Sequence, residues 1–195
     1  VPFKIPERGD KAKLIKMAVT NAKLHLNDRA LALEKRERNR IPAAISDLHH
    51  FLSLSRLPRT IHCFDNSNFQ GAYPVASMVS FVDAKPRKTQ YKHFHIKTVI
   101  GPDDFASMAE ILTRQYTSVQ KNGEHIPDLI VVDGGKGQLS AAVRALKEIG
   151  FYGECEIIGL AKRLEEVFIP GRKDAIMIPK TSPALKLLQQ VRDEA

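Results

Sequence analysis

The stretch that most constrains the fold is "LIVV", residues 129–132, in which every side chain is apolar. A strand of this kind is typical of a sheet interior that is covered by helices on both faces. Segments with helical periodicity precede it at 101–116 and follow it at 137–150, and a second apolar strand is predicted at 155–160. Because helices separate these strands from what precedes them, parallel pairing is favoured.

Three further strands are predicted upstream, at residues 60–65, 75–83 and 90–99. Their short connections favour an antiparallel meander. The predicted architecture is α/β, a mixed five-stranded sheet flanked by helices. Residues 165–179 are expected to form a hairpin around Pro170–Gly171, and a last helix is expected to open at Ser182.

Residues 1–59 have a different character, helical and basic, and are predicted to form a short N-terminal segment before a domain at 60–195. The chain of 195 residues carries a formal net charge of +8. A surplus of this size suggests a polyanionic partner such as nucleic acid, although a soluble protein can also simply be basic. No apolar run approaches the roughly 18 residues of a membrane span, and no signal-peptide centre is present.

Two smaller expectations concern apolar and sulfur-containing residues. One core-facing stripe is expected on the helix at 101–116, comprising Phe105, Met108, Ile111, Leu112 and Tyr116. Cys63 and Cys155 lie in strand-like runs. We expect them to be reduced core thiols of a cytosolic protein, with a disulfide between them as the alternative.

Aspartates stand at the ends of predicted elements. Asp65 interrupts the first strand, Asp103 and Asp104 begin a helix, and Asp133 ends the buried strand. If the first and fourth strands are neighbours, Asp65 and Asp133 approach each other, and the helix start can bring Asp104 to the same place. Each aspartate also has an ordinary explanation, as an Asx-turn residue, a helix cap or a turn residue before glycines.

Taken together, these carboxylates indicate a cation site. Like charges gathered beside an apolar sheet repel and lose hydration, which is costly without a compensating cation. Carboxylate oxygens suit Mg²⁺ or Mn²⁺. A basic protein with such a metal site has what phosphodiester hydrolysis requires, because the metal activates water while Lys and Arg hold the nucleic-acid backbone.

Other polar residues follow the fourth and fifth strands. Lys136, Gln138, Lys162 and Arg163 are candidates for phosphate contacts, with solvated surface as the alternative. The segment "DGGKGQ" lacks the spacing and the Lys-Ser/Thr ending of a nucleotide-binding P-loop. The histidine pairs at 49–50 and 93/95 have no Cys or carboxylate at ligand spacing, so surface positions are expected for them.

The sequence resembles the C-terminal endonuclease region of UvrC, the incision subunit of bacterial nucleotide excision repair. The stretches that carry the resemblance run from end to end: "VPFKIPERGDK", "IHCFDNSNFQG", "VASMVSF", "HFHIKTVIGPDDFASM", "PDLIVVDGGKGQL", "GLAKRLEEVFIPG" and "SPALKLLQQVRDEA". Many members have a different triplet where this chain has "NSN" after the aspartate, which makes this segment a variant within the family.

The resemblance implies an RNase H-like fold with catalytic, metal-binding carboxylates at Asp65, Asp104 and Asp133, and leaves Asp103 mainly as a cap. It implies a cytoplasmic, Mg²⁺- or Mn²⁺-dependent endonuclease that makes the incision 5′ to a lesion in double-stranded DNA, together with UvrA and UvrB. The alternative is an inactive nucleic-acid-binding or scaffold module. The family continues beyond "RDEA" into a histidine, so the domain is expected to be truncated at Ala195 and this fragment to incise weakly or not at all.

Overall fold

The computed structural model describes residues 6, 8–38, 41–67, 75–99, 101, 103–162 and 166–195. Contacts divide the chain into two units, residues 1–40 and 41–195. The division expected from the sequence lay between residues 59 and 60. The structure instead groups the helix α2 (Ala43–Leu52) with the sheet, because Ile45, Leu48 and Leu52 are buried in the core there.

The first unit contains one helix, α1 (Asp10–Arg38). Its large apolar side chains among the described residues are exposed, and four of them, Leu14, Met17, Leu24 and Leu26, are more than half exposed. They form no core within this unit.

The second unit is built on one mixed sheet of eight strands among the described residues, in the order β3-β2-β1-β5-β6-β7-β8, with β4 also paired to β2. The strands are β1 (Thr60–Ser67), β2 (Val75–Val82), β3 (Lys85–Pro86), β4 (Lys92–His95), β5 (Leu129–Asp133), β6 (Glu156–Ala161), β7 (Glu166–Phe168) and β8 (Ile176–Met177). The prediction of five strands is therefore wrong. The expected hairpin does form, but its strands β7 and β8 extend the sheet beyond β6, and β3 folds back on β2.

The centre of the sheet agrees with the sequence analysis. β1 pairs antiparallel with β2, and β2 pairs antiparallel with β4. On its other side β1 pairs parallel with β5, which pairs parallel with β6. All five residues of β5 are buried, as an apolar strand covered on both faces requires.

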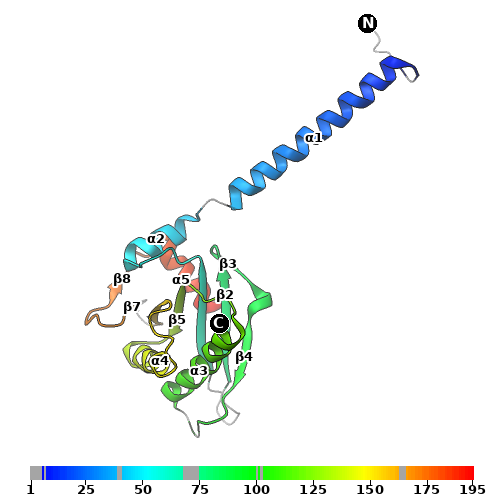
Figure 1. Ribbon diagram of the computed structural model, residues 1–195. Helices are drawn as coiled ribbons and strands as arrows, with labels where there is room; N and C mark the ends of the chain where they lie inside the picture. Colours follow the sequence, from blue (N-terminus) through cyan, green and yellow to red (C-terminus); the bar gives the residue numbers. More distant parts are fainter. Residues whose placement is uncertain are drawn as a thin grey trace. The chain divides into compact units, whose positions relative to one another are not determined.

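Helices cover both faces of this sheet (Figure 1). On one face α2 packs beside α5 (Pro183–Asp193), and on the other α3 (Asp104–Asn122) packs beside α4 (Lys136–Glu148). Side chains alternate along β1, so Ile61 and Cys63 enter the first core while Phe64 enters the second. Ser182 caps α5 by accepting a hydrogen bond from the Ala184 N–H, as predicted.

A short 3-10 turn, η1 (Lys88–Gln90), precedes β4. Within the described chain, no helix combines the length and apolarity needed to cross a membrane.

Candidate active site

Asp65 and Asp133 lie level with each other on neighbouring parallel strands. The register pairs Phe64 with Val132, and each aspartate is the next residue along its strand. The sequence predicted that Asp65 interrupts its strand, and this prediction is wrong. β1 continues to Ser67, and Asp65 stands opposite Ser77 of β2. The first carboxylate is therefore held inside the sheet rather than on a turn.

The two carboxylates are partly removed from water and contact each other. The side chain of Asp133 is 4% exposed and that of Asp65 19% exposed. Burial, followed by a hydrogen bond to Asp133 and the charge of that carboxylate, raises the pKa of Asp65 to about 6. Repulsion between two such groups favours either a shared proton or a cation beside them.

Lys162, directly after β6, supplies a cation in this structure. Its Nζ lies 2.8 Å from Asp133 Oδ2 and 4.0 Å from Asp65 Oδ1. The hydrogen bond to Asp133 is the main cause that raises the pKa of Lys162. The sequence analysis treated this lysine as a phosphate contact, and the structure places its ammonium on the carboxylates. Arg163, its predicted companion, lies outside the described residues.

Asp104 is the first residue of α3, and Asp103 is the cap of that helix, as expected. The Asp103 carboxylate accepts hydrogen bonds from the N–H groups of Phe105 at 3.0 Å and Ala106 at 2.9 Å. The Asp104 carbonyl oxygen accepts a hydrogen bond of 2.9 Å from Asn66 Nδ2, which ties the helix start to the end of β1.

An open cavity of about 690 Å³ connects the start of α3 to the segment that follows Asp133. Its lining residues are Asp103, Asp104, Phe105, Gly135, Gly137 and Gln138. Among the residues that the structure describes, no three His, Cys, Asp or Glu side chains are grouped so as to hold a metal ion. The structure thus brings Asp65 and Asp133 together and places Asp104 beside the following segment, without closing a three-carboxylate group.

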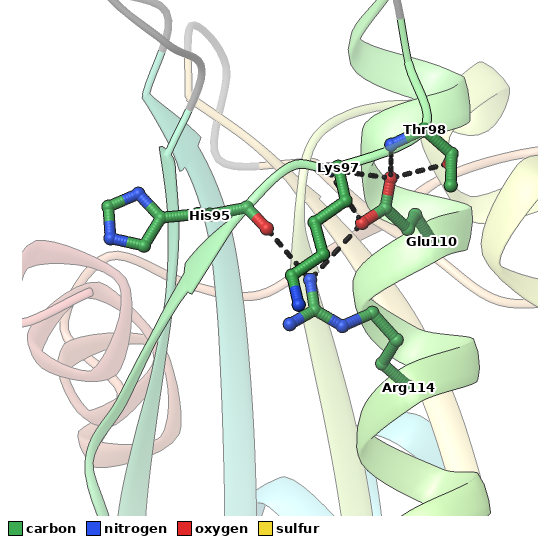
Figure 2. Close-up of polar contacts among 5 residues, drawn as sticks. All are labelled: His95, Lys97, Thr98, Glu110 and Arg114. Carbon is green, nitrogen blue, oxygen red and sulfur yellow. Dashed lines mark hydrogen bonds and ion pairs between the residues drawn. The ribbon is translucent and has the colours of Figure 1, made fainter.

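A hydrogen-bond network that the sequence analysis missed holds the segment before α3 (Figure 2). The Glu110 carboxylate on α3 accepts hydrogen bonds from the N–H groups of Lys97 and Thr98, each at 2.9 Å, and from the Thr98 hydroxyl at 2.6 Å. Arg114 Nη1 donates to Glu110 at 3.1 Å and to the His95 carbonyl at 2.8 Å.

This network fixes the end of β4 against α3, and so supports the helix that begins at Asp104. Burial opposes ionisation of Glu110, but the hydrogen bonds from Thr98 and Lys97 outweigh it and lower its pKa. The signal available in the sequence was the spacing of Glu110 and Arg114, four residues apart on one helix.

Lys136 and Gln138, the other predicted phosphate contacts, lie in the first turn of α4. The Lys136 ammonium donates to the Lys173 carbonyl and lies 6.0 Å from the centre of the Phe168 ring. The Gln138 side chain folds over Gly134, where a Cβ atom would stand 1.4 Å from its Oε1. Both residues follow Asp133 closely in the sequence. Their contact with DNA stays a prediction.

Fold and site together define an α/β domain with paired carboxylates at the carboxyl ends of adjacent central strands, an arrangement suited to metal-assisted hydrolysis. Residues 49–195 match the family model described as the UvrC RNAse H endonuclease domain. The chain belongs to this family, as the resemblance in its sequence predicted.

Curated relatives extend over nearly the whole chain. The UvrABC system protein C of Prosthecochloris aestuarii is 50% identical over 194 residues, which are 99% of this chain and 31% of that protein. The protein of the same name from Salinibacter ruber is 48% identical over 197 residues, 100% of this chain and 31% of that protein. The chain thus spans about a third of the length of these relatives. Among solved structures, human ENDOV aligns with a TM-score of 0.41 and 14% identity over 69% of this chain and 60% of that chain.

Proposed function

We propose that this chain is a divalent-metal-dependent endonuclease domain that makes the incision 5′ to a lesion in nucleotide excision repair. Its substrate is damaged double-stranded DNA, and it works with UvrA and UvrB in the cytoplasm. The observation that carries the proposal is the contact between Asp65 and Asp133, two level and partly buried carboxylates whose neutralising partner is the exposed side chain of Lys162.

These residues fit a divalent cation. Their donors are carboxylate oxygens, which Mg²⁺ and Mn²⁺ prefer. Burial, followed by the hydrogen bond to Asp133 and the charge of that carboxylate, raises the pKa of Asp65 even with Lys162 beside it, and a further cation would stabilise the ionised pair. Asp65 and Asp133 would hold the ion, and Asp104 would complete or orient the site. When bound, the ion supplies an activated water and stabilises charge on the phosphate.

The remaining residues of the site have binding roles in this proposal. Lys136, Gln138 and Arg163 would contact phosphates of the DNA backbone. Such contacts do not depend on the base sequence. Because they neutralise phosphate charges, binding should weaken steeply as salt rises. Lys162 would leave the carboxylates for a phosphate when the metal enters.

The first test is the thermal stability of the chain with Mn²⁺. An ion that binds only the folded state stabilises it by about 2.7 kcal/mol at a concentration 100 times its Kd. For a chain of 195 residues this raises Tm by roughly 5–10 °C. Asp65→Asn should largely remove the shift. Asp103→Asn is the matched control, because Asn is an equally good helix cap and should leave the shift intact.

The second test is incision of a lesion-bearing duplex in the presence of UvrA and UvrB. We expect at most weak cleavage 5′ to the lesion that requires Mg²⁺ or Mn²⁺ and that is lost in Asp65→Asn and Asp133→Asn but kept in Asp103→Asn. The same substitutions at the matching positions of a full-length UvrABC system protein C should abolish its incision, and incision that survives them would favour the alternative, a module that binds nucleic acid or scaffolds other repair proteins. If neither the shift nor incision depends on Asp65, the proposed site is wrong.

A further inference from the structure

Phe105 departs from the core stripe that the sequence predicts for α3. Met108, Ile111, Leu112 and Tyr116 are completely buried, but Phe105 is 51% exposed. It lies in the first turn of the helix, directly after Asp104. Single exposed hydrophobic side chains are ordinary on protein surfaces, so the functional interpretation of this ring rests on what lies around it.

The Phe105 ring rests against α4 at Gly137, where any side chain would push the ring aside. A Cβ atom at Gly137 would lie 2.8 and 2.9 Å from two ring carbons, closer than such atoms approach. Glycine within a helix costs about 1 kcal/mol relative to alanine. Glycine therefore lowers the helix propensity of the first turn of α4 at the point where the ring rests. The ring packs against this turn while part of it stays exposed to solvent.

The ring also borders two cavities. One is the cavity of about 690 Å³ that contains Asp104 and Gln138. The other, of about 390 Å³, lies between α3 and α4 and includes Arg144, an exposed cation. A path over the surface thus leads from the start of α3, across an aromatic ring, to a guanidinium group, with the carboxylates of Asp103 and Glu148 also lining this second cavity.

We propose that Phe105 is a nucleobase-stacking residue that holds an unpaired base of the cleaved strand beside the site, with Arg144 contacting the backbone phosphate beyond it. This inference rests on the proposed function and names a subsite for its DNA. Aromatic rings accept any base because each has a π face, and a cation spaced along the groove follows the backbone. The cavity beyond the ring is lined by small alanine side chains, Ala106, Ala109, Ala141 and Ala145, which leave room beside the ring for a flat base.

The test uses the whole chain in metal-free buffer, where no cleavage occurs. The probe is a fluorescein-labelled duplex with a short unpaired bubble, and binding is followed by fluorescence anisotropy. We expect Phe105→Ala to weaken binding by roughly 5- to 100-fold, the usual effect of losing one base–aromatic stack. Phe105→Trp should bind like the wild type. Gly137→Ala, which displaces the ring without removing it, should also weaken binding.

A second readout reports stacking itself. A 2-aminopurine placed in the bubble should lose fluorescence when the wild-type chain or Phe105→Trp binds, and should keep it with Phe105→Ala. The matched control is Tyr152→Ala, which removes another exposed aromatic ring beyond the opposite end of α4. It should change neither readout. Thermal melts should show all variants folded, since Phe105 and Tyr152 are both substantially exposed.

The outcomes separate this inference from the proposed function. If Phe105→Ala binds and quenches like the wild type, while Mn²⁺ still stabilises the chain through Asp65, the stacking subsite is wrong and the nuclease proposal stands. If the wild-type chain binds no DNA at low salt, both are wrong. Weakened binding without a difference in 2-aminopurine quenching would overturn stacking as well, since the ring would then act on something other than a base.

Discussion

Replacing Lys162 by methionine should make the carboxylate pair a better site for a divalent ion. The substitution keeps an apolar stem of similar length and removes only the charge. In the structure the ammonium occupies the position beside Asp133 and Asp65 that another cation would need. An incoming ion must therefore displace it, and the free energy of that displacement is lost from metal affinity.

The size of the effect follows from the two distances. With the dielectric constant of water, the ammonium at 2.8 Å from Asp133 and 4.0 Å from Asp65 interacts by about 1.5 and 1 kcal/mol. The lysine side chain is 66% exposed, so screening and the entropy of its long chain reduce the net value to about 1 kcal/mol. That corresponds to a Kd for Mn²⁺ roughly fivefold lower in Lys162→Met than in the wild type.

Isothermal titration with Mn²⁺ at low salt measures this directly. Lys136→Met is the matched control, because that ammonium binds the Lys173 carbonyl rather than a carboxylate, and its Kd should stay near that of the wild type. The difference between Lys162→Met and wild type should shrink as salt rises. Unchanged or weaker Mn²⁺ binding by Lys162→Met would refute the view that this lysine competes with the metal.

Two further predictions concern stability. Burial, followed by the charges of Lys92 and His125, lowers the pKa of His62 to about 4 from 6.5. The unfolded chain therefore takes up this proton first, and stability falls as pH decreases, by about 2.5 kcal/mol between pH 7 and 4.5. In denaturant titrations His62→Asn should lose that much less over the same range, and equal losses would contradict the assignment. Glu110→Gln should lower the unfolding free energy by about 1–3 kcal/mol, because an amide cannot accept all the hydrogen bonds that the carboxylate accepts. The exposed Glu124→Gln should cost less than about 0.5 kcal/mol, and an equal cost for the two variants would contradict a special role for Glu110.

The central strands and their order could be predicted because their signals are long and local. β1, β2 and β5 each have five or more residues with a clear pattern, and helices between strands determine where parallel pairing occurs. The approach of Asp65 and Asp133 followed from that order alone. By contrast, β3 has only two residues, too few to show alternation, and the pattern that predicted the hairpin of β7 and β8 did not indicate that it pairs with β6, so the predicted sheet was too small.

Side-chain placement at the site was less predictable, for two physical reasons. The position of the Lys162 ammonium depends on a turn after β6 and on a flexible side chain, neither of which has a periodic signal. The exposure of Phe105 was missed because a helical stripe was assumed to lie on the core along its whole length. In the structure the first turn of α3 leaves its ring against Gly137 instead.

The three aspartates of the proposed site are positioned by restraints of unequal strength. Asp65 and Asp133 lie on central strands, where backbone pairing on both sides fixes their relative position. Asp104 begins a helix whose start is held by side-chain hydrogen bonds: Asn66 donates to the Asp104 carbonyl, and the Glu110 carboxylate accepts from N–H groups of the segment before the helix. Such bonds contribute about 1 kcal/mol each, much less than a paired sheet. The carboxylate pair is therefore the rigid part of the site, and the third aspartate is the part whose position substitutions at Asn66 or Glu110 would change first.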